Sequence, residues 1–267
     1  MLDQHTIYIA FALTMIAGLS TGIGSLIALV AKRTNTKFLC ASLGFSAGVM
    51  LYVSFMDILP VAKEGLIQHL GNKAGTLSLI LSFFGGIGLI TLIDLLIPKT
   101  NNPHEVQCIE DMGKPGNEQL HRAGILVALS LAIHNFPEGI ATFTSALSGL
   151  SVAIPITVAI AIHNIPEGIA VSVPIYHATG SRRKAFWMSF LAGLTEPVGA
   201  LLAYLFLAPF WSPVMNGILL AAVSGIMVYI SLDELLPTAE KFGEHHISIS
   251  GLIMGMAVMA MSLFLFI

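Results

Sequence analysis

Eight long apolar segments take up most of the chain and limit what it can fold into. A helix that spans a bilayer needs about 20 mainly apolar residues. Charged residues make up only 10% of the sequence, whereas soluble domains average about 25%. We therefore predict an all-α integral membrane protein. Its eight transmembrane helices are expected over residues 6–31, 39–60, 74–97, 122–147, 151–176, 184–207, 214–236 and 246–267.

Basic residues lie almost entirely on one side of this predicted topology. Of the 12 Lys and Arg residues, all but Lys63 and Lys73 lie in the connections after the first, third, fifth and seventh spans. Because basic loops stay in the cytoplasm, we expect a multi-pass protein of the cell inner (plasma) membrane with both termini outside the cytoplasm. The chain 1–267 is predicted to be a single membrane domain, in which the polar segment 98–121 is a mobile cytoplasmic loop.

Charge and cysteine content exclude two other classes of protein. The net charge of −3 is too near zero to indicate a nucleic-acid partner. Cys40 and Cys108 form no motif with each other, which argues against a disulfide framework or a zinc knuckle. We expect the lipid bilayer as the main partner. The oligomeric state is left open, and a homodimer is one option.

Acidic residues lie inside the predicted spans without basic neighbours. An ionised carboxylate near the bilayer centre costs about 3 kcal/mol or more, and no Lys or Arg lies deep in any span to balance it. Protons and metal cations remain as the neutralising groups, which favours a cation pathway. The carboxylates are those of Asp57, Asp94, Glu138, Glu167, Glu196, Asp233 and Glu234.

The motif His-Asn-x-Pro-Glu-Gly occurs twice, in the fourth and in the fifth span. Its spacing places His, Asn and Glu of each copy on one helical face. Because a very short turn joins the two spans, they are antiparallel neighbours, and both motifs lie near the bilayer midplane. If the two faces oppose each other, their side chains form a metal site. The residues are His134, Asn135, Glu138, His163, Asn164 and Glu167.

The prolines and glycines of the motif add to this expectation. Pro137 and Pro166 each remove a backbone hydrogen bond, so both helices are expected to kink, as transporter helices often do at ion sites. Gly139 and Gly168 allow close backbone approach. Glu196, which precedes another proline at similar depth in the sixth span, is a further candidate ligand. Imidazole with carboxylate suits zinc, iron(II), manganese or cobalt, and the lack of thiolates argues against copper(I).

Two similar acidic stretches, around Asp57 and around Asp233-Glu234, run in opposite directions through the membrane. They indicate an inverted repeat of three, two and three helices with the kinked fourth and fifth helices at the centre. These acids either attract cations at the entrance and exit or are interfacial acids in water. His245 and His246 either collect exiting metal or lie in a solvated loop. Close helix packing is expected at Gly44, Gly48 and Gly85-Gly86.

These motifs resemble the ZIP family of divalent metal transporters, in particular its bacterial ZupT type, over the whole chain. The resemblance implies a two-metal centre with uptake of zinc, iron(II), manganese and cobalt as cargo, and no catalytic residue or resident cofactor. The cytoplasmic loop contains only two histidines, His104 and His121, and one cysteine, Cys108, so a histidine-rich metal sensor is not expected there. The centre would use His134, Asn135, Glu138, His163, Asn164, Glu167 and Glu196.

Two other functions remain open from the residues. An intramembrane metal-dependent hydrolase would use the metal to activate water, although the motif His-Glu-x-x-His is absent. A metal exporter driven by proton antiport would use the same site in the opposite direction. Fold symmetry permits either direction, and only the resemblance favours uptake.

Overall fold

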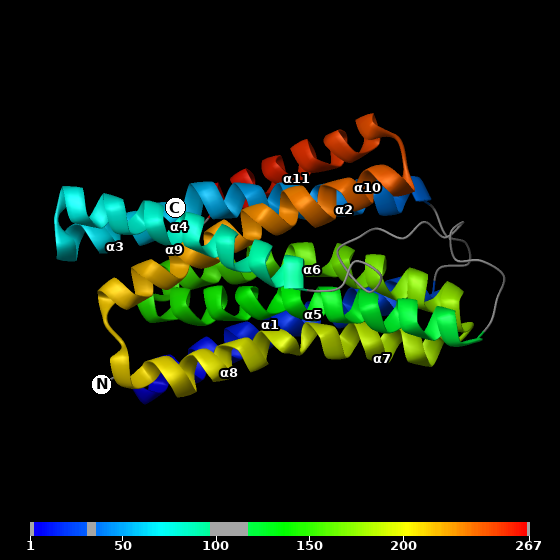
Figure 1. Cartoon of the computed structure of the whole chain (residues 1–267), viewed down its shortest axis with the longest axis horizontal. Coiled ribbons are helices and arrows are strands. Elements are labelled where there is room, and N and C mark those ends of the chain that lie inside the picture. The colour runs from blue at the N-terminus through cyan, green and yellow to red at the C-terminus, as the bar shows by residue number, and fades with distance from the viewer. Residues whose placement is uncertain (1–2, 31–35, 97–116, 266–267) are drawn as a thin grey trace.

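The computed structural model describes residues 3–30, 36–96 and 117–265, with the backbone alone for 117–131 and at positions 28, 96, 174, 177, 178, 207, 208 and 242. Long helices lie side by side in one elongated bundle (Figure 1). The described ranges contain no strand, so the predicted all-α class is confirmed. The helices of the first half are α1 (Gln4–Val30), α2 (Thr36–Val53), the π-helix η1 (Ser54–Ile58), α3 (Leu59–Leu70), α4 (Asn72–Leu96) and α5 (Asn117–Ser148). Those of the second half are α6 (Leu150–Thr179), α7 (Arg182–Gly193), α8 (Thr195–Leu207), η3 (Ala208–Phe210), α9 (Pro213–Ile230), the π-helix η4 (Ser231–Leu235), α10 (Leu236–Phe242) and α11 (His245–Leu265).

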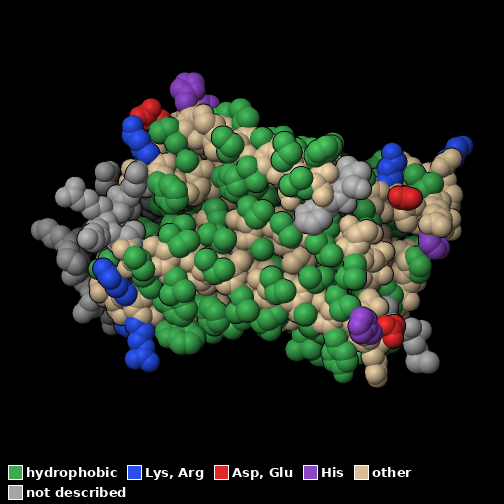
Figure 2. All heavy atoms as spheres, turned by 180° about the vertical axis from the view of Figure 1, so that it is seen from behind, with side chains coloured by type: hydrophobic (Ala, Val, Ile, Leu, Met, Phe, Trp, Pro, Cys, Tyr) green, Lys and Arg blue, Asp and Glu red, His purple; other side chains and the backbone are tan. Residues whose placement is uncertain are grey.

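The surface of the bundle suits a bilayer. Seven helical segments of the described residues are long and apolar enough to cross a membrane. They correspond to every predicted span except the fourth, which lies in the 32-residue helix α5. Apolar side chains cover the middle of the molecule, and charged ones gather toward its two ends (Figure 2). The protein is therefore a multi-pass membrane protein, while its orientation and the plasma membrane stay predictions.

The second and seventh spans continue further than predicted. α2 runs through η1 into α3 to give 35 helical residues, and α9 runs through η4 into α10. The predicted ends were residue 60, which is Pro60, and residue 236, next to Pro237. Each proline instead lies in the first turn of the helix that follows a π-helix, and the chain stays helical there although the proline has no N–H to donate.

Prolines in the central helices act differently from the proline in the sixth span. α5 and α6 stay helical through Pro137 and Pro166. The sixth span is interrupted at Leu194, between α7 and α8. Pro197 follows closely and has no N–H to donate to the carbonyl of Gly193. The interruption therefore places Glu196 in the first turn of α8.

The first three and last three spans repeat the same helix contacts, which confirms the inverted repeat. A Cβ added at Gly48 in α2 would lie 2.0 Å from the carbonyl oxygen of Leu252 in α11. Between the seventh and third spans, which the repeat relates to the second and eighth, a Cβ added at Gly225 in α9 would lie 2.1 Å from the carbonyl oxygen of Phe83 in α4. η1 and η4 also occupy equivalent positions in α2 and α9. α5 and α6 lie between the two halves and contact both.

The predicted cytoplasmic loop falls largely on residues 97–116, which lie outside the described residues together with His104 and Cys108. α5 begins at Asn117, so the last part of the predicted loop, 98–121, is helical. The single-domain organisation stays a prediction.

Candidate metal centre

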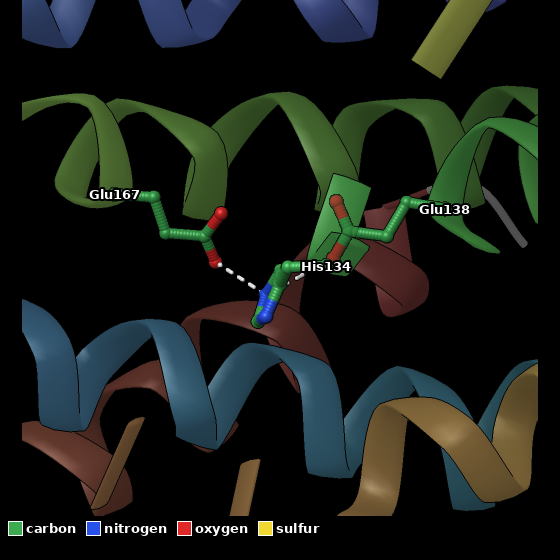
Figure 3. Close-up of side chains that lie close together, drawn as sticks. All are labelled: His134, Glu138 and Glu167. Carbon is green, nitrogen blue, oxygen red and sulfur yellow. Dashed lines mark hydrogen bonds and ion pairs between the residues drawn. The ribbon is translucent and has the colours of Figure 1, made fainter. Parts of the chain in front are cut away.

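Histidine and glutamate side chains from α5 and α6 meet near the middle of both helices. His134 Nε2 of α5 lies 3.2 Å from Glu167 Oε1 of α6. His163 Nε2 of α6 lies 3.0 Å from Glu138 Oε1 of α5. Each histidine therefore contacts the acid of the other helix, and the two motif faces oppose each other as predicted. Figure 3 shows the imidazole of His134 between the two carboxylates, and these three residues offer ligand atoms within 4.8 Å of one another.

The asparagines connect this group to the neighbouring helices. Asn164 Nδ2 donates hydrogen bonds to Glu196 Oε1 at 2.5 Å and to the carbonyl oxygen of Ala17 in α1 at 3.0 Å. Asn135 Nδ2 donates to the carbonyl oxygen of Ala192 in α7 at 3.4 Å. Glu196 thus joins the centre through Asn164. Among the described residues, Asn135 makes its side-chain hydrogen bond to Ala192 and to none of the other six candidate ligands.

Several buried polar atoms of the centre have no hydrogen-bond partner among the described residues. Burying such an atom costs about 1–3 kcal/mol when nothing replaces its water. Oxygen and imidazole nitrogen atoms together form a donor set that suits zinc, iron(II), manganese and cobalt. The residues present therefore fit divalent cations. The unpartnered atoms are Oδ1 of Asn135 and Asn164, Oε2 of Glu138, Glu167 and Glu196, and Nδ1 of His163.

No basic side chain balances the acids of the centre in the described part of the chain. Glu138, Glu167 and Glu196 are buried, whereas every described Lys and Arg side chain is exposed. Two histidines face three carboxylates. An uncompensated charge in this setting is costly, so the centre favours an added proton or metal cation.

Two residues outside the predicted site also reach the centre. Glu234 Oε2 lies 3.8 Å from Nδ1 of His134, on the side of the ring opposite the two motif acids. The sequence predicts Glu234 near a membrane face, because its span is expected to end at residue 236. Ser46 of α2 donates a hydrogen bond to Glu167 Oε1 at 2.9 Å. A single serine in an apolar helix gives no sequence signal for such a contact.

The other predicted acids lie outside this group of contacts. Asp57 is partly buried in η1 and keeps an unpartnered Oδ2. Because the helix continues to Leu70, Asp57 is not near the outer helix end, where sequence analysis placed it. Asp233 is exposed, and Asp94 lies near the end of α4.

The histidines before the last span are exposed, in agreement with a solvated connection. His245 Nδ1 lies 2.5 Å from Glu240 Oε1, and both side chains are exposed. Lys37 Nζ lies 3.5 Å from Glu244 Oε1, again at the surface. Exposed ion pairs of this kind contribute little to stability.

Comparison with known proteins agrees with this geometry. The model of the ZIP zinc transporter family matches residues 98–263. The chain is also 57% identical to the zinc transporter ZupT of Clostridium perfringens (strain 13 / Type A), over 99% of this chain and 98% of that protein. The chain belongs to the ZIP family. Another ZIP protein, the zinc transporter ZupT of Streptococcus mutans serotype c, is 57% identical over the full length of both chains. The ZupT protein of Lysinibacillus sphaericus is 58% identical over 98% of each chain.

Membership of the ZIP family excludes one of the two alternative functions that the sequence left open. ZIP proteins are transporters, so this chain is not an enzyme and the intramembrane hydrolase is excluded. A metal at the centre is accordingly cargo and not a resident cofactor. The resemblance to the bacterial ZupT type is confirmed by these relatives.

Proposed function

We propose that this ZIP protein carries zinc across the plasma membrane into the cytoplasm, with a broad specificity that includes iron(II), manganese and cobalt. The observation that supports this most is the pair of crossed His–Glu contacts at 3.0 and 3.2 Å, surrounded by unpartnered buried oxygens. The metal is held, in this proposal, by His134, Asn135, Glu138, His163, Asn164, Glu167 and Glu196.

The chemistry of these ligands accounts for both binding and release. A divalent cation that enters from outside loses its water to carboxylate, imidazole and amide donors, which replace the hydration shell. When the cation leaves toward the cytoplasm, protons on the Glu side chains limit the repulsion among the empty carboxylates. Neutral ligands such as the two asparagine amides keep the total negative charge low enough for the cation to leave.

Glycine contacts divide the helices into two groups that can move against each other. A Cβ added at Gly24 of α1 would lie 1.9 Å from the carbonyl oxygen of Ile165, and one at Gly139 of α5 would lie 1.9 Å from that of Glu196. Such contacts join α1, α5, α6, α7 and α8, here named the site group. Others join α2 to α11 and α4 to α9. Together with α3 and α10, these four helices are named the flanking group.

The surface between the two groups supports a transport step in which one group rocks against the other. Among the described glycines, none makes a backbone contact of this closeness between a site-group helix and a flanking-group helix. Close backbone packing resists sliding, because any shift produces a clash. The candidate ligands lie where the two groups meet, since Ser46 of α2 and Glu234 of η4, which connects α9 to α10, contact residues of α5 and α6.

Zinc flux in proteoliposomes tests the proposal. Vesicles that contain the purified protein and an internal zinc-sensitive dye are expected to take up external zinc faster than protein-free vesicles. Iron(II), manganese and cobalt are each expected to slow this uptake by competition. Absence of zinc flux contradicts the proposed function. Zinc flux that requires a proton gradient, with protons moving in the opposite direction, and that runs only from the cytoplasmic face to the outer face supports the exporter instead.

Glu234→Gln is expected to reduce zinc uptake about 10-fold or more. Groups that hold a metal ligand in place from outside typically account for 10–100-fold in affinity or activity, and Glu234 faces the ring nitrogen of His134 that points away from Glu167. Asp233→Asn, one residue earlier and exposed, is the matched control and is expected to lose less than about 2-fold. Initial uptake rates in proteoliposomes measure both variants. Equal rates for wild type and Glu234→Gln contradict the assigned contact.

A further inference from the structure

Ser46 is a buried hydroxyl of α2 that contacts the centre without belonging to its motifs. Its Oγ donates to Glu167 Oε1 at 2.9 Å and also lies 3.3 Å from the carbonyl oxygen of His163. Glu167 Oε1 meets His134 Nε2 as well. These two contacts hold one carboxylate oxygen of Glu167 and leave Oε2 without a partner, which is the oxygen that a cation can take.

Comparison of the two internal repeats shows that only the first one has the residue that makes this contact. In the second half of the chain, the position equivalent to Ser46 is Val223 of α9, because Gly48 and Ser54 correspond to Gly225 and Ser231. Valine has no hydroxyl to donate. Glu138, the equivalent of Glu167, contacts only the two motif histidines among the described residues. The two motif carboxylates are therefore inequivalent, and Glu167 alone is oriented from outside α5 and α6.

Ser46 is also one of few polar side chains that join the two helix groups. α2 belongs to the flanking group, and Glu167 lies in α6 of the site group. Two other polar contacts between the groups are described: Glu234 lies 3.8 Å from Nδ1 of His134, and Asn216 of α9 donates to Ser148 at 2.6 Å at the end of α5, away from the motifs. Any shift of α2 along α6 therefore removes a donor from a candidate metal ligand.

We propose that Ser46 is a positioning residue that makes the hold of Glu167 on a cation depend on how α2 lies against α6. This inference rests on the proposed function. Outer donors that orient a ligating carboxylate account for about 10–100-fold in metal affinity. With Ser46 in contact, Glu167 presents Oε2 and binds the cation tightly. After the helix groups shift, the donor is lost and the same ligands bind more weakly. A carrier needs such a difference between two states to bind on one side and release on the other.

Zinc binding to the purified full-length protein in detergent, measured by calorimetry, tests this role. Ser46→Ala is expected to weaken zinc binding about 10- to 100-fold. Ser46→Thr keeps the hydroxyl and is expected to bind within about 3-fold of wild type. The matched control is Ser42→Ala, the same substitution one turn earlier in α2, which is expected to leave the affinity unchanged. In proteoliposomes, Ser46→Ala is expected to raise the KM for zinc while Vmax stays near wild type.

The outcomes separate this inference from the proposed function. Unchanged affinity in Ser46→Ala overturns it, and so does equal weakening in Ser46→Thr, because the hydroxyl is then not the cause. A lower Vmax with an unchanged KM overturns it as well, since that pattern indicates less folded protein. In each of these cases wild-type zinc transport still stands. Wild-type protein that neither binds nor transports zinc contradicts the proposed function itself.

Discussion

Glu138→Gln and Glu167→Gln are each expected to abolish zinc uptake while the protein still inserts into the membrane. Each substitution keeps the size of the side chain and removes the negative charge on which a cation site in hydrocarbon depends. Loss of an outer donor alone costs 10–100-fold, so loss of a central carboxylate is expected to lower uptake by more than about 100-fold. Initial rates in proteoliposomes, normalised to reconstituted protein, measure the effect.

Glu64→Gln provides the control for these two variants. It is the same substitution on an exposed side chain of α3, away from α5 and α6, and is expected to leave uptake within about 2-fold of wild type. Removing the charge of Glu138 or Glu167 also removes one partner from a buried His–Glu contact. Thermal unfolding in detergent must therefore accompany the flux measurement. Wild-type uptake by both buried variants contradicts a metal centre at this place.

The parts of the fold that follow from local sequence were predicted well. A long apolar segment has few stable states in lipid other than a spanning helix, so the spans follow from hydropathy. The crossed contacts of α5 and α6 follow from a repeated motif, a short turn and helical geometry. His134 and His163 lie at matching depth because the motif copies are at similar distances from Gly149. No tertiary information was needed for these conclusions.

The parts that depend on packing between distant segments were not predicted. The second and seventh spans were predicted to end at residues 60 and 236, because a π-helix that lets the chain continue leaves no clear pattern in a single sequence. Glu234 was therefore placed near a membrane face instead of beside His134. The contact of Ser46 with Glu167 depends on the rotation of α2 against α6, and neither helix specifies that rotation alone.

Glycines show the same division between local and tertiary information. Gly85 and Gly86 are adjacent and read equally as close packing positions. In the structure, a Cβ at Gly86 would lie 2.0 Å from the carbonyl oxygen of Ala222, whereas one at Gly85 meets nothing within 4 Å. Only the neighbouring helix distinguishes them. Gly44, Gly48, Gly139 and Gly168 do lie at close backbone contacts, as predicted.

Gly139→Ala is expected to destabilise the protein by about 3 kcal/mol or more and to abolish zinc uptake. The added methyl group would lie 1.9 Å from the carbonyl oxygen of Glu196, which is backbone and cannot rotate away as a side chain can. Relief of the clash requires α5 and α8 to separate. Because Gly139 follows Glu138 directly, that separation moves two candidate ligands, Glu138 and Glu196, apart.

The direction in which Gly139→Ala shifts the unfolding midpoint shows whether the backbone contact or simple helix propensity dominates the stability of this variant. Alanine stabilises a helix interior by about 0.5–1 kcal/mol relative to glycine, so propensity alone predicts a higher unfolding midpoint for every such substitution. Gly85→Ala, which meets open space in α4, is expected to follow propensity and raise the midpoint of thermal unfolding in detergent. Gly139→Ala is expected to lower it, and so is Gly168→Ala, whose Cβ would lie 2.0 Å from the carbonyl oxygen of Thr21. If Gly139→Ala and Gly85→Ala shift the midpoint in the same direction, then α5 and α8 are not in backbone contact at Glu196. The placement of that acid beside Asn164 would then be wrong as well.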